Sequence, residues 1–172
     1  LQPDDVVTIA PIPLARIWMV DRFARNGELF MPEGASLAQA IASAGGAVLT
    51  LPPSLEPSDP TFYQDAEVVV RRGSAATRLK LNDVDALTAF TVAAGDTITV
   101  ELPRTIKVTV TGESPNPGEK VWREGTELSR VIAAAQGAGP QGTLQGVLVL
   151  RGAEVFVVNA AERLGGRPSP PF

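Results

Sequence analysis

The chain has 172 residues, of which 44% are hydrophobic, a net charge of −4 and neither His nor Cys. The hydrophobic fraction favours packed cores over disorder, whereas the negative charge argues against a nucleic-acid partner, whose binding requires a basic surface. Without His or Cys, the usual catalytic triads and zinc sites are excluded, so we expect no enzyme activity, no catalytic residue, no metal and no cofactor.

The first 14 residues contain a strand pattern. In LQPDDVVTI (1–9), acidic residues precede alternating apolar residues, and VAAGDTITV (92–100) has a similar arrangement. We interpret 1–14 as the end strand of a preceding unit or as a linker, and the sequence as a piece of a longer protein. Such a protein could carry a signal peptide or an anchor elsewhere.

An internal duplication organises the rest of the chain. Residues 17–46 match residues 108–137 without a gap, at a spacing of 91 residues. From Gly27 and Gly118 onward, nine of 20 aligned positions are identical, where chance pairing would give about one. We therefore expect a first domain at 15–103 and a second domain at 104–172, the second being truncated before its last strand.

Each copy contains one short amphipathic helix. The helix of the second copy is predicted to begin at an N-cap on Thr126 and to end at Gly137 or Gly139, and Ala35 or Ser36 lies near the cap in the first copy. Helices of about 10 residues do not persist alone in water, so both must pack on a sheet. Their apolar positions are Leu37, Ala40, Ile41 and Ala44 in one copy and Leu128, Val131, Ile132 and Ala135 in the other.

Two hairpins follow the helices, at 67–81 and 146–159, and each turns at an Arg-Gly pair. Their spacing of 79 residues is shorter than 91, so the first copy carries 12 extra residues. These lie in the Pro-rich stretch 49–65, which we interpret as a surface insertion because proline is excluded from helix interiors and central strands. The order predicts an α+β fold with two tandem β-grasp-like units, each a small mixed sheet covered by one short helix.

Four motifs together resemble a known family. VTVTGESPNPG (108–118), EGTELSRVIAAAQG (124–137), VLVLRG (147–152) and VAAGDTITV (92–100) are similar to motifs of the soluble-ligand-binding β-grasp (SLBB) domains of outer-membrane polysaccharide biosynthesis and export proteins. The first copy departs at DRFARNG (21–27), which lacks the first Gly and the Pro residues of the corresponding turn.

The resemblance implies a non-enzymatic module in the periplasm or cell envelope, associated with the outer membrane in the full-length protein. It further implies a homo-oligomeric ring, the passage of a capsule or exopolysaccharide polymer with weak, distributed contacts, and an export partner in the inner membrane. No stretch of the sequence is long and apolar enough for a membrane span, so we expect no direct insertion by this segment. The alternative is a small-ligand-binding β-grasp module of another envelope or competence system.

Trp122, Arg123 and Arg151 are the first candidates for polymer contact, because an aromatic face and bidentate donors suit sugars and acidic polymers. Trp18 and Tyr63 are second candidates. A competing interpretation places Trp122, which aligns with Met31, in a core or a subunit interface.

Three further patterns are interpreted as structural. GAGPQG (137–142) follows a helix and precedes a strand, the reverse of a dinucleotide-binding context. NDVD (82–85) lacks the rest of a calcium loop and is interpreted as a solvated turn. The duplicated acids are interpreted as exposed turn carboxylates rather than as a glycosidase pair; they are Glu28, Glu33, Glu119 and Glu124.

Overall fold

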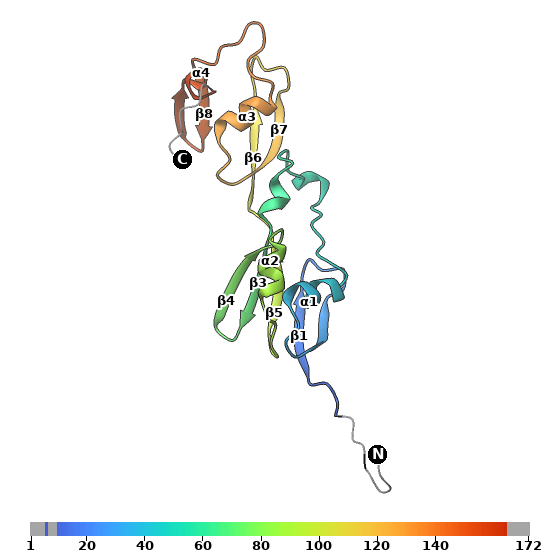
Figure 1. Cartoon of the computed structure of the whole chain (residues 1–172). Helices are drawn as coiled ribbons and strands as arrows, with labels where there is room; N and C mark the ends of the chain where they lie inside the picture. Colours follow the sequence, from blue (N-terminus) through green and yellow to red (C-terminus); the bar gives the residue numbers. More distant parts are fainter. Residues whose placement is uncertain (1–5, 7–9, 165–172) are drawn as a thin grey trace. The chain divides into compact units, whose positions relative to one another are not determined.

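The computed structural model describes residue 6 and residues 10–164, which form a mixed α+β structure (Figure 1). Two compact units divide it. The first unit runs to Thr50 and resumes from Tyr63 to Leu102, and the second combines Leu51–Phe62 with the chain from Pro103 onward. Among the described residues, no helix is long and apolar enough to cross a membrane. The presence of both helices and a mixed sheet confirms the predicted α+β class.

The first unit is built on a five-stranded mixed sheet of order β2-β1-β5-β3-β4. The central strand β5 pairs in parallel with β1 and antiparallel with β3. The hairpins β1–β2 and β3–β4 are both antiparallel. Burial alternates along β1, as expected for a strand with one face on a core. The strands are β1 (Leu14–Val20), β2 (Gly27–Pro32), β3 (Glu67–Arg72), β4 (Ala75–Lys80) and β5 (Thr97–Glu101).

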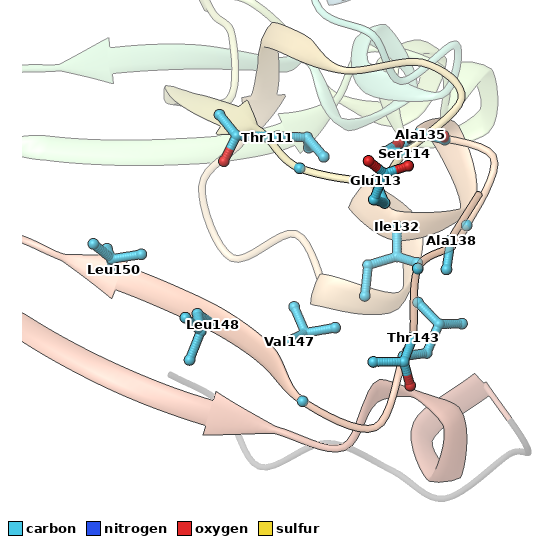
Figure 2. A pocket seen from close by; sticks show the side chains of 16 residues that line it. Thr111, Glu113, Ser114, Ile132, Ala135, Ala138, Thr143, Val147, Leu148 and Leu150 are labelled. Atoms are coloured by element: carbon cyan, nitrogen blue, oxygen red, sulfur yellow. Dashed lines mark hydrogen bonds between the residues drawn. The ribbon is translucent and has the colours of Figure 1, made fainter. Parts of the chain in front are cut away.

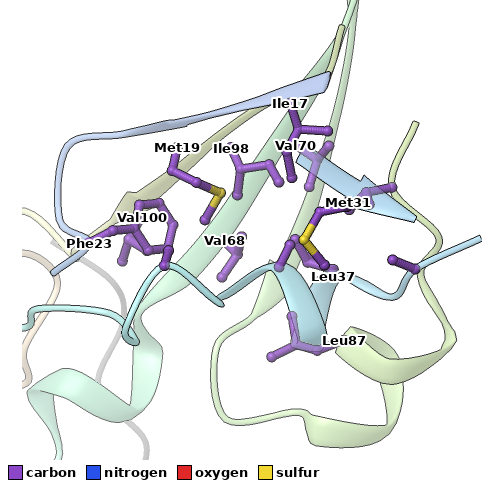
Figure 3. Packing of buried hydrophobic residues seen from close by; sticks show 14 residues of the cluster. Ile17, Met19, Phe23, Met31, Leu37, Val68, Val70, Leu87, Ile98 and Val100 are labelled. Carbon is purple, nitrogen blue, oxygen red and sulfur yellow. The ribbon is translucent and has the colours of Figure 1, made fainter. Parts of the chain in front are cut away.

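Two short helices pack on the core of this sheet, where we expected one. α1 (Leu37–Ser43) starts at Ser36, whose hydroxyl accepts from the Gln39 N–H while the Gln39 side chain accepts from the Ser36 N–H. Leu37 is fully buried in the same apolar cluster as Ile98 of β5 (Figure 3). The predicted apolar face and the cap at Ser36 are thus confirmed, although the helix has seven residues.

A second helix, α2 (Val84–Ala89), occupies part of the stretch that we expected to be a turn. The side chain of Asp83 caps it by accepting from the Ala86 N–H at 3.0 Å, and Leu87 packs into the core. All four residues of NDVD are exposed and Asn82 lies in a turn, as predicted, but Val84 and Asp85 begin a helix, so the prediction of a solvated turn is confirmed only in part.

The second unit repeats the order hairpin, helix, hairpin and helix of the first unit. β6 and β7 form one antiparallel pair, and β8 and β9 form another. No strand joins the two pairs within the described part of this unit. The elements are β6 (Thr105–Val110), β7 (Gly118–Arg123), α3 (Leu128–Ala134), β8 (Val147–Arg151), β9 (Glu154–Val158) and α4 (Ala160–Leu164).

Both Arg-Gly hairpin turns are confirmed: Gly73 and Gly152 each have a φ of 60°, a conformation that favours glycine.

The cap of α3 differs from the prediction. It is Glu127, and the Thr126 hydroxyl instead donates to the carbonyl oxygen of Arg123 at 2.7 Å. Since Thr126 is held in the preceding turn, the helix begins one residue later than expected.

Much of the Pro-rich stretch belongs to the second unit, where we expected all of 49–65 to belong to the first. Leu51–Phe62, which includes the 3-10 turn η1 (Pro53–Leu55), groups with the second unit. Pro57 forms a bridge with Val121 of β7, and the Ser58 N–H donates to the Val121 carbonyl at 2.8 Å. A further 3-10 turn, η2 (Phe62–Asp65), leads back into the first unit.

Candidate functional site

The strongest candidate surface lies on the outer face of the β1–β2 hairpin. β1 alternates buried and exposed residues, so that Trp18, 41% exposed, projects away from the core. In the antiparallel register Arg16 lies opposite Phe30, and Trp18 lies opposite Glu28. We call these four residues, Arg16, Trp18, Glu28 and Phe30, the aromatic face.

Polar contacts order the aromatic face. The Arg16 guanidinium lies 5.9 Å from the centre of the Trp18 ring, and its Nε is 3.2 Å from a carboxylate oxygen of Glu28. Such cation–π contacts contribute about 0.5–1 kcal/mol at exposed sites. Phe30 is 57% exposed beside them. The arrangement offers apolar rings for stacking next to one donor group and one acceptor group.

The second unit repeats the ion pair but not the aromatic side chains. Lys107 and Glu119, which occupy the positions of Arg16 and Glu28, are 2.7 Å apart. Thr109 stands where the first unit has Trp18, and Val121, at the position of Phe30, is only 7% exposed. Glu28 and Glu119 are exposed as expected, but they lie in the strands β2 and β7 rather than in turns, whereas Glu33 and Glu124 do lie in exposed turns.

The other predicted contact residues are distant in sequence from the aromatic face. Trp122 is 3% exposed, which agrees with the core interpretation, and its Nε1 has no acceptor among the described residues. Arg123 and Tyr63 are half-buried. Arg151 is exposed at the end of β8, with its guanidinium 5.9 Å from the ring of Phe156.

A cavity of about 380 Å³ lies within the second unit (Figure 2). Its walls are the turn after β6, one side of α3 and the strand β8, with Ile132, Val147 and Leu148 among the side chains that line it. The GAGPQG loop forms part of the wall, where the Gly139 N–H donates to the Glu113 carbonyl at 2.8 Å. This loop follows α3 and precedes β8, as predicted.

An ion pair between a half-exposed arginine and a buried aspartate in the first unit was not predicted from the sequence. Asp96 has no exposed surface and accepts from Arg72 through both carboxylate oxygens, at 2.7 and 2.8 Å. Burial raises the pKa of Asp96, but the Arg72 hydrogen bonds, the Ala93 N–H and the charge of Arg72 together hold that pKa below its usual range. The pair fixes the turn into β5.

A comparable carboxylate fixes the Pro-rich stretch in the second unit. Asp59 accepts from the hydroxyl of Thr61 at 2.7 Å and its N–H at 2.8 Å, and from Arg130 of α3 at 3.0 Å. The two hydrogen bonds from Thr61 are the main reason that the pKa of Asp59 lies below its usual range, and Arg130 adds to them against the opposing effect of burial. Sequence analysis missed this residue, although Asp-Pro-Thr is a turn signal.

In the described part of the chain, no three acidic residues gather in a way that could hold a metal ion. No protein-family model and no curated protein matches the chain. The resemblance to SLBB domains therefore stays a prediction from the motif residues.

Proposed function

We propose that this chain is a non-enzymatic module of a capsule or exopolysaccharide export protein, in which two tandem β-grasp-like units of the SLBB type contribute to ring assembly and to polymer passage. It would act in the periplasm, as part of a protein associated with the outer membrane and with an inner-membrane export partner. The duplicated motifs and the repeated order of two hairpins and a helix support this assignment.

The aromatic face is the observation that carries the polymer-contact part of the proposal. Trp18 and Phe30 expose ring surface beside the Arg16–Glu28 pair. Sugar rings have apolar faces that stack on aromatic side chains, and their hydroxyl groups accept from guanidinium and donate to carboxylate. A shallow face of this kind gives weak contacts, which let a polymer move past.

The two tryptophans make this proposal testable by fluorescence. We expect titration with alginate as an acidic polysaccharide, or with dextran as a neutral one, to change the emission of a Trp122→Phe variant, in which Trp18 is the remaining tryptophan. Dissociation constants near the millimolar range, about −4 kcal/mol, are expected for a shallow site. The matched variant, Trp18→Phe, retains the buried Trp122 and should show no change.

Two results would contradict the polymer-contact role. One is an equal response from both variants, and the other is no response to either polysaccharide. Arg16→Gln provides a further check, because it removes the cation beside Trp18 while the apolar core behind β1 stays intact. It should weaken binding of alginate more than binding of dextran.

The cavity of the second unit favours one alternative, a small-ligand-binding module of another envelope or competence system. Its volume of about 380 Å³ lies in the range of small-molecule sites. Tight stoichiometric binding would raise the melting temperature of the second unit in a thermal-shift screen, whereas weak polymer contacts would barely change it.

A further inference from the structure

A cavity of about 510 Å³ lies in the first unit, between the turn that joins β1 to β2 and the end of α1. Part of its wall is apolar, since Met19 and Ala44, each 1% exposed, belong to the core cluster (Figure 3). The exposed residues Arg25, Asn26 and Ser43 line its polar part. A site with both kinds of wall suits a sugar ring, which has apolar faces and hydroxyl groups.

Backbone hydrogen bonds hold the turn against the end of α1. The Arg25 N–H donates to the Ala44 carbonyl at 2.8 Å, and the Ala24 N–H donates to the Gly46 carbonyl at 3.1 Å. Phe23 of the same turn is 4% exposed and packs in the core cluster. The wall of the cavity is therefore formed in the absence of a ligand, so binding requires little ordering of the turn.

The charge around this cavity suits an anionic group. Residues 14–32 contain three arginines and two acidic residues, in a chain whose net charge is −4. Within the described residues, the exposed guanidinium of Arg25 forms neither a hydrogen bond nor an ion pair. Glu28 also lines the cavity, but its carboxylate is 3.2 Å from the Arg16 guanidinium, which partly offsets its charge. Arg25 is thus the cation that a ligand can reach.

The second unit has different side chains at the corresponding place. Asn116, the counterpart of Arg25, donates through its side-chain amide to the Ala134 carbonyl at 3.1 Å. Pro117 stands where the first unit has Asn26 and supplies no side-chain donor. The cation of the first unit therefore has no equivalent at this place, and the Asn116 amide is already bonded to the helix end. The second unit serves as an internal control.

We propose that the cavity beside the β1–β2 turn binds a carboxylate-bearing sugar unit of an acidic polysaccharide, with the carboxylate on Arg25. The inference rests on the proposed function and names the class of its polymer. Glu28 connects the two sites, because it lines the cavity and lies opposite Trp18 in the aromatic face. One sugar unit stacks on Trp18, and a neighbouring unit of the same polymer enters the cavity.

The side chains at the cavity favour an acidic sugar over a neutral one. A guanidinium binds a carboxylate through two parallel hydrogen bonds. The Asn26 amide and the Ser43 hydroxyl each donate and accept, as the hydroxyl groups of a sugar require. A neutral sugar offers these hydroxyl contacts but no anion for Arg25, so the cavity selects by charge.

Polymer titration of charge variants tests the proposal in the Trp122→Phe background, where Trp18 reports binding. Arg25→Gln should weaken alginate binding about threefold to tenfold and leave dextran binding within about twofold. Arg22→Gln is the matched control, because it removes the same charge from the same turn. Arg22 does not line the cavity and donates to the Thr50 carbonyl, so its loss should change alginate binding by less than about twofold.

The outcomes separate the cavity from the aromatic face. Equal losses for Arg25→Gln and Arg22→Gln, or equal weakening of alginate and dextran by Arg25→Gln, overturn the cavity assignment while the polymer-contact role of Trp18 stands. A Trp122→Phe protein that responds to neither polysaccharide contradicts the proposed function itself, and the cavity assignment falls with it. Ser43→Leu fills the cavity and keeps Arg25, so it should also weaken alginate binding; unchanged binding would contradict the cavity as the site.

Amide NMR locates the contact with single sugars. Glucuronate should shift the amide resonances of residues 25–27 more than glucose does at the same concentration. Asn116 and Gly118, at the corresponding positions of the second unit, should not shift. Equal shifts with acetate and glucuronate would overturn the assignment to a sugar unit, and equal shifts in the two units would overturn the assignment to this cavity.

Discussion

Arg72, the last residue of β3, holds Asp96, the residue before β5, through two nearly parallel hydrogen bonds: Nε to Oδ1 at 2.7 Å and Nη2 to Oδ2 at 2.8 Å. Asp96 also accepts from the Ala93 N–H, and Arg72 donates to the Thr91 carbonyl. The pair therefore connects a strand end with the turn that leads into the central strand of the first unit.

Arg72→Gln should destabilise the first unit by about 1–3 kcal/mol, because it removes a charged partner from a fully buried carboxylate. We expect a value toward the lower end, since the Arg72 side chain is half exposed. Denaturant unfolding followed by Trp18 fluorescence in a Trp122→Phe background measures the loss.

The matched control for Arg72→Gln is Arg71→Gln. Arg71 lies on the same strand and has one exposed ion pair, 3.8 Å from Glu101, so its loss should cost less than about 0.5 kcal/mol. Equal losses for the two variants would show that the Asp96 pair has no special role in the stability of the unit.

The stability of the first unit should depend on acid pH through Asp96. Its native pKa lies below the ordinary value of 3.8, so the stability it contributes is fully present above that value and is lost as pH falls through the native pKa. Asp96→Asn should flatten this decline in the free energy of unfolding. Parallel pH profiles for wild type and variant would contradict the assignment.

Asp59→Ala should destabilise the second unit and release the Pro-rich stretch, because Asp59 bonds Thr61 and Arg130 from a 7% exposed side chain. The expected cost is about 1–3 kcal/mol, measured by unfolding with Trp122 as the probe. Asp65→Ala removes a more exposed carboxylate, paired with Lys80 in the first unit, and should cost that unit less than about 1 kcal/mol while leaving the unfolding reported by Trp122 unchanged. Faster proteolysis within 51–62 should accompany only the first change.

Gly142→Ala should destabilise the second unit by about 1–3 kcal/mol, because the added Cβ would lie 2.7 Å from the backbone oxygen of Glu113. Gly146→Ala is the matched change: no atom lies within 4 Å of its Cβ position, and we expect a neutral or slightly stabilising effect. A fully stable Gly142→Ala variant would mean that the loop does not pack against the Glu113 turn.

Periodicity predicted the hairpins and the helix faces because these depend on residues close together in sequence. The Arg-Gly turns at Gly73 and Gly152 required only local glycine conformations. The Asp96 pair joins side chains 24 residues apart, and no local pattern marks it. The helix α2 did have a local signal, since Asp83 precedes apolar residues at helical spacing, but it was interpreted as a turn.

The candidate site was predicted only in part. Trp18 was a second choice, although the alternation along β1 already placed it on the opposite face from Ile17. Trp122 was a first choice despite its alignment with Met31, which is buried in the first unit. Leu51–Phe62 groups with the second unit, where Ser58 bonds Val121 and Asp59 bonds Arg130, and the sequence pattern did not indicate these tertiary contacts.

The most direct test of the difference between the two units is amide hydrogen exchange of β3 and β8, measured in dilute protein at which sedimentation finds only single copies. The account predicts that amides of Val68–Val70 exchange at least about 100-fold more slowly than those of Val147–Val149, because β3 has a strand on both sides whereas, among the described residues, β8 has a strand on one side. Equal protection of the two strands in the monomer would contradict the difference in strand pairing between β3 and β8 of the described residues.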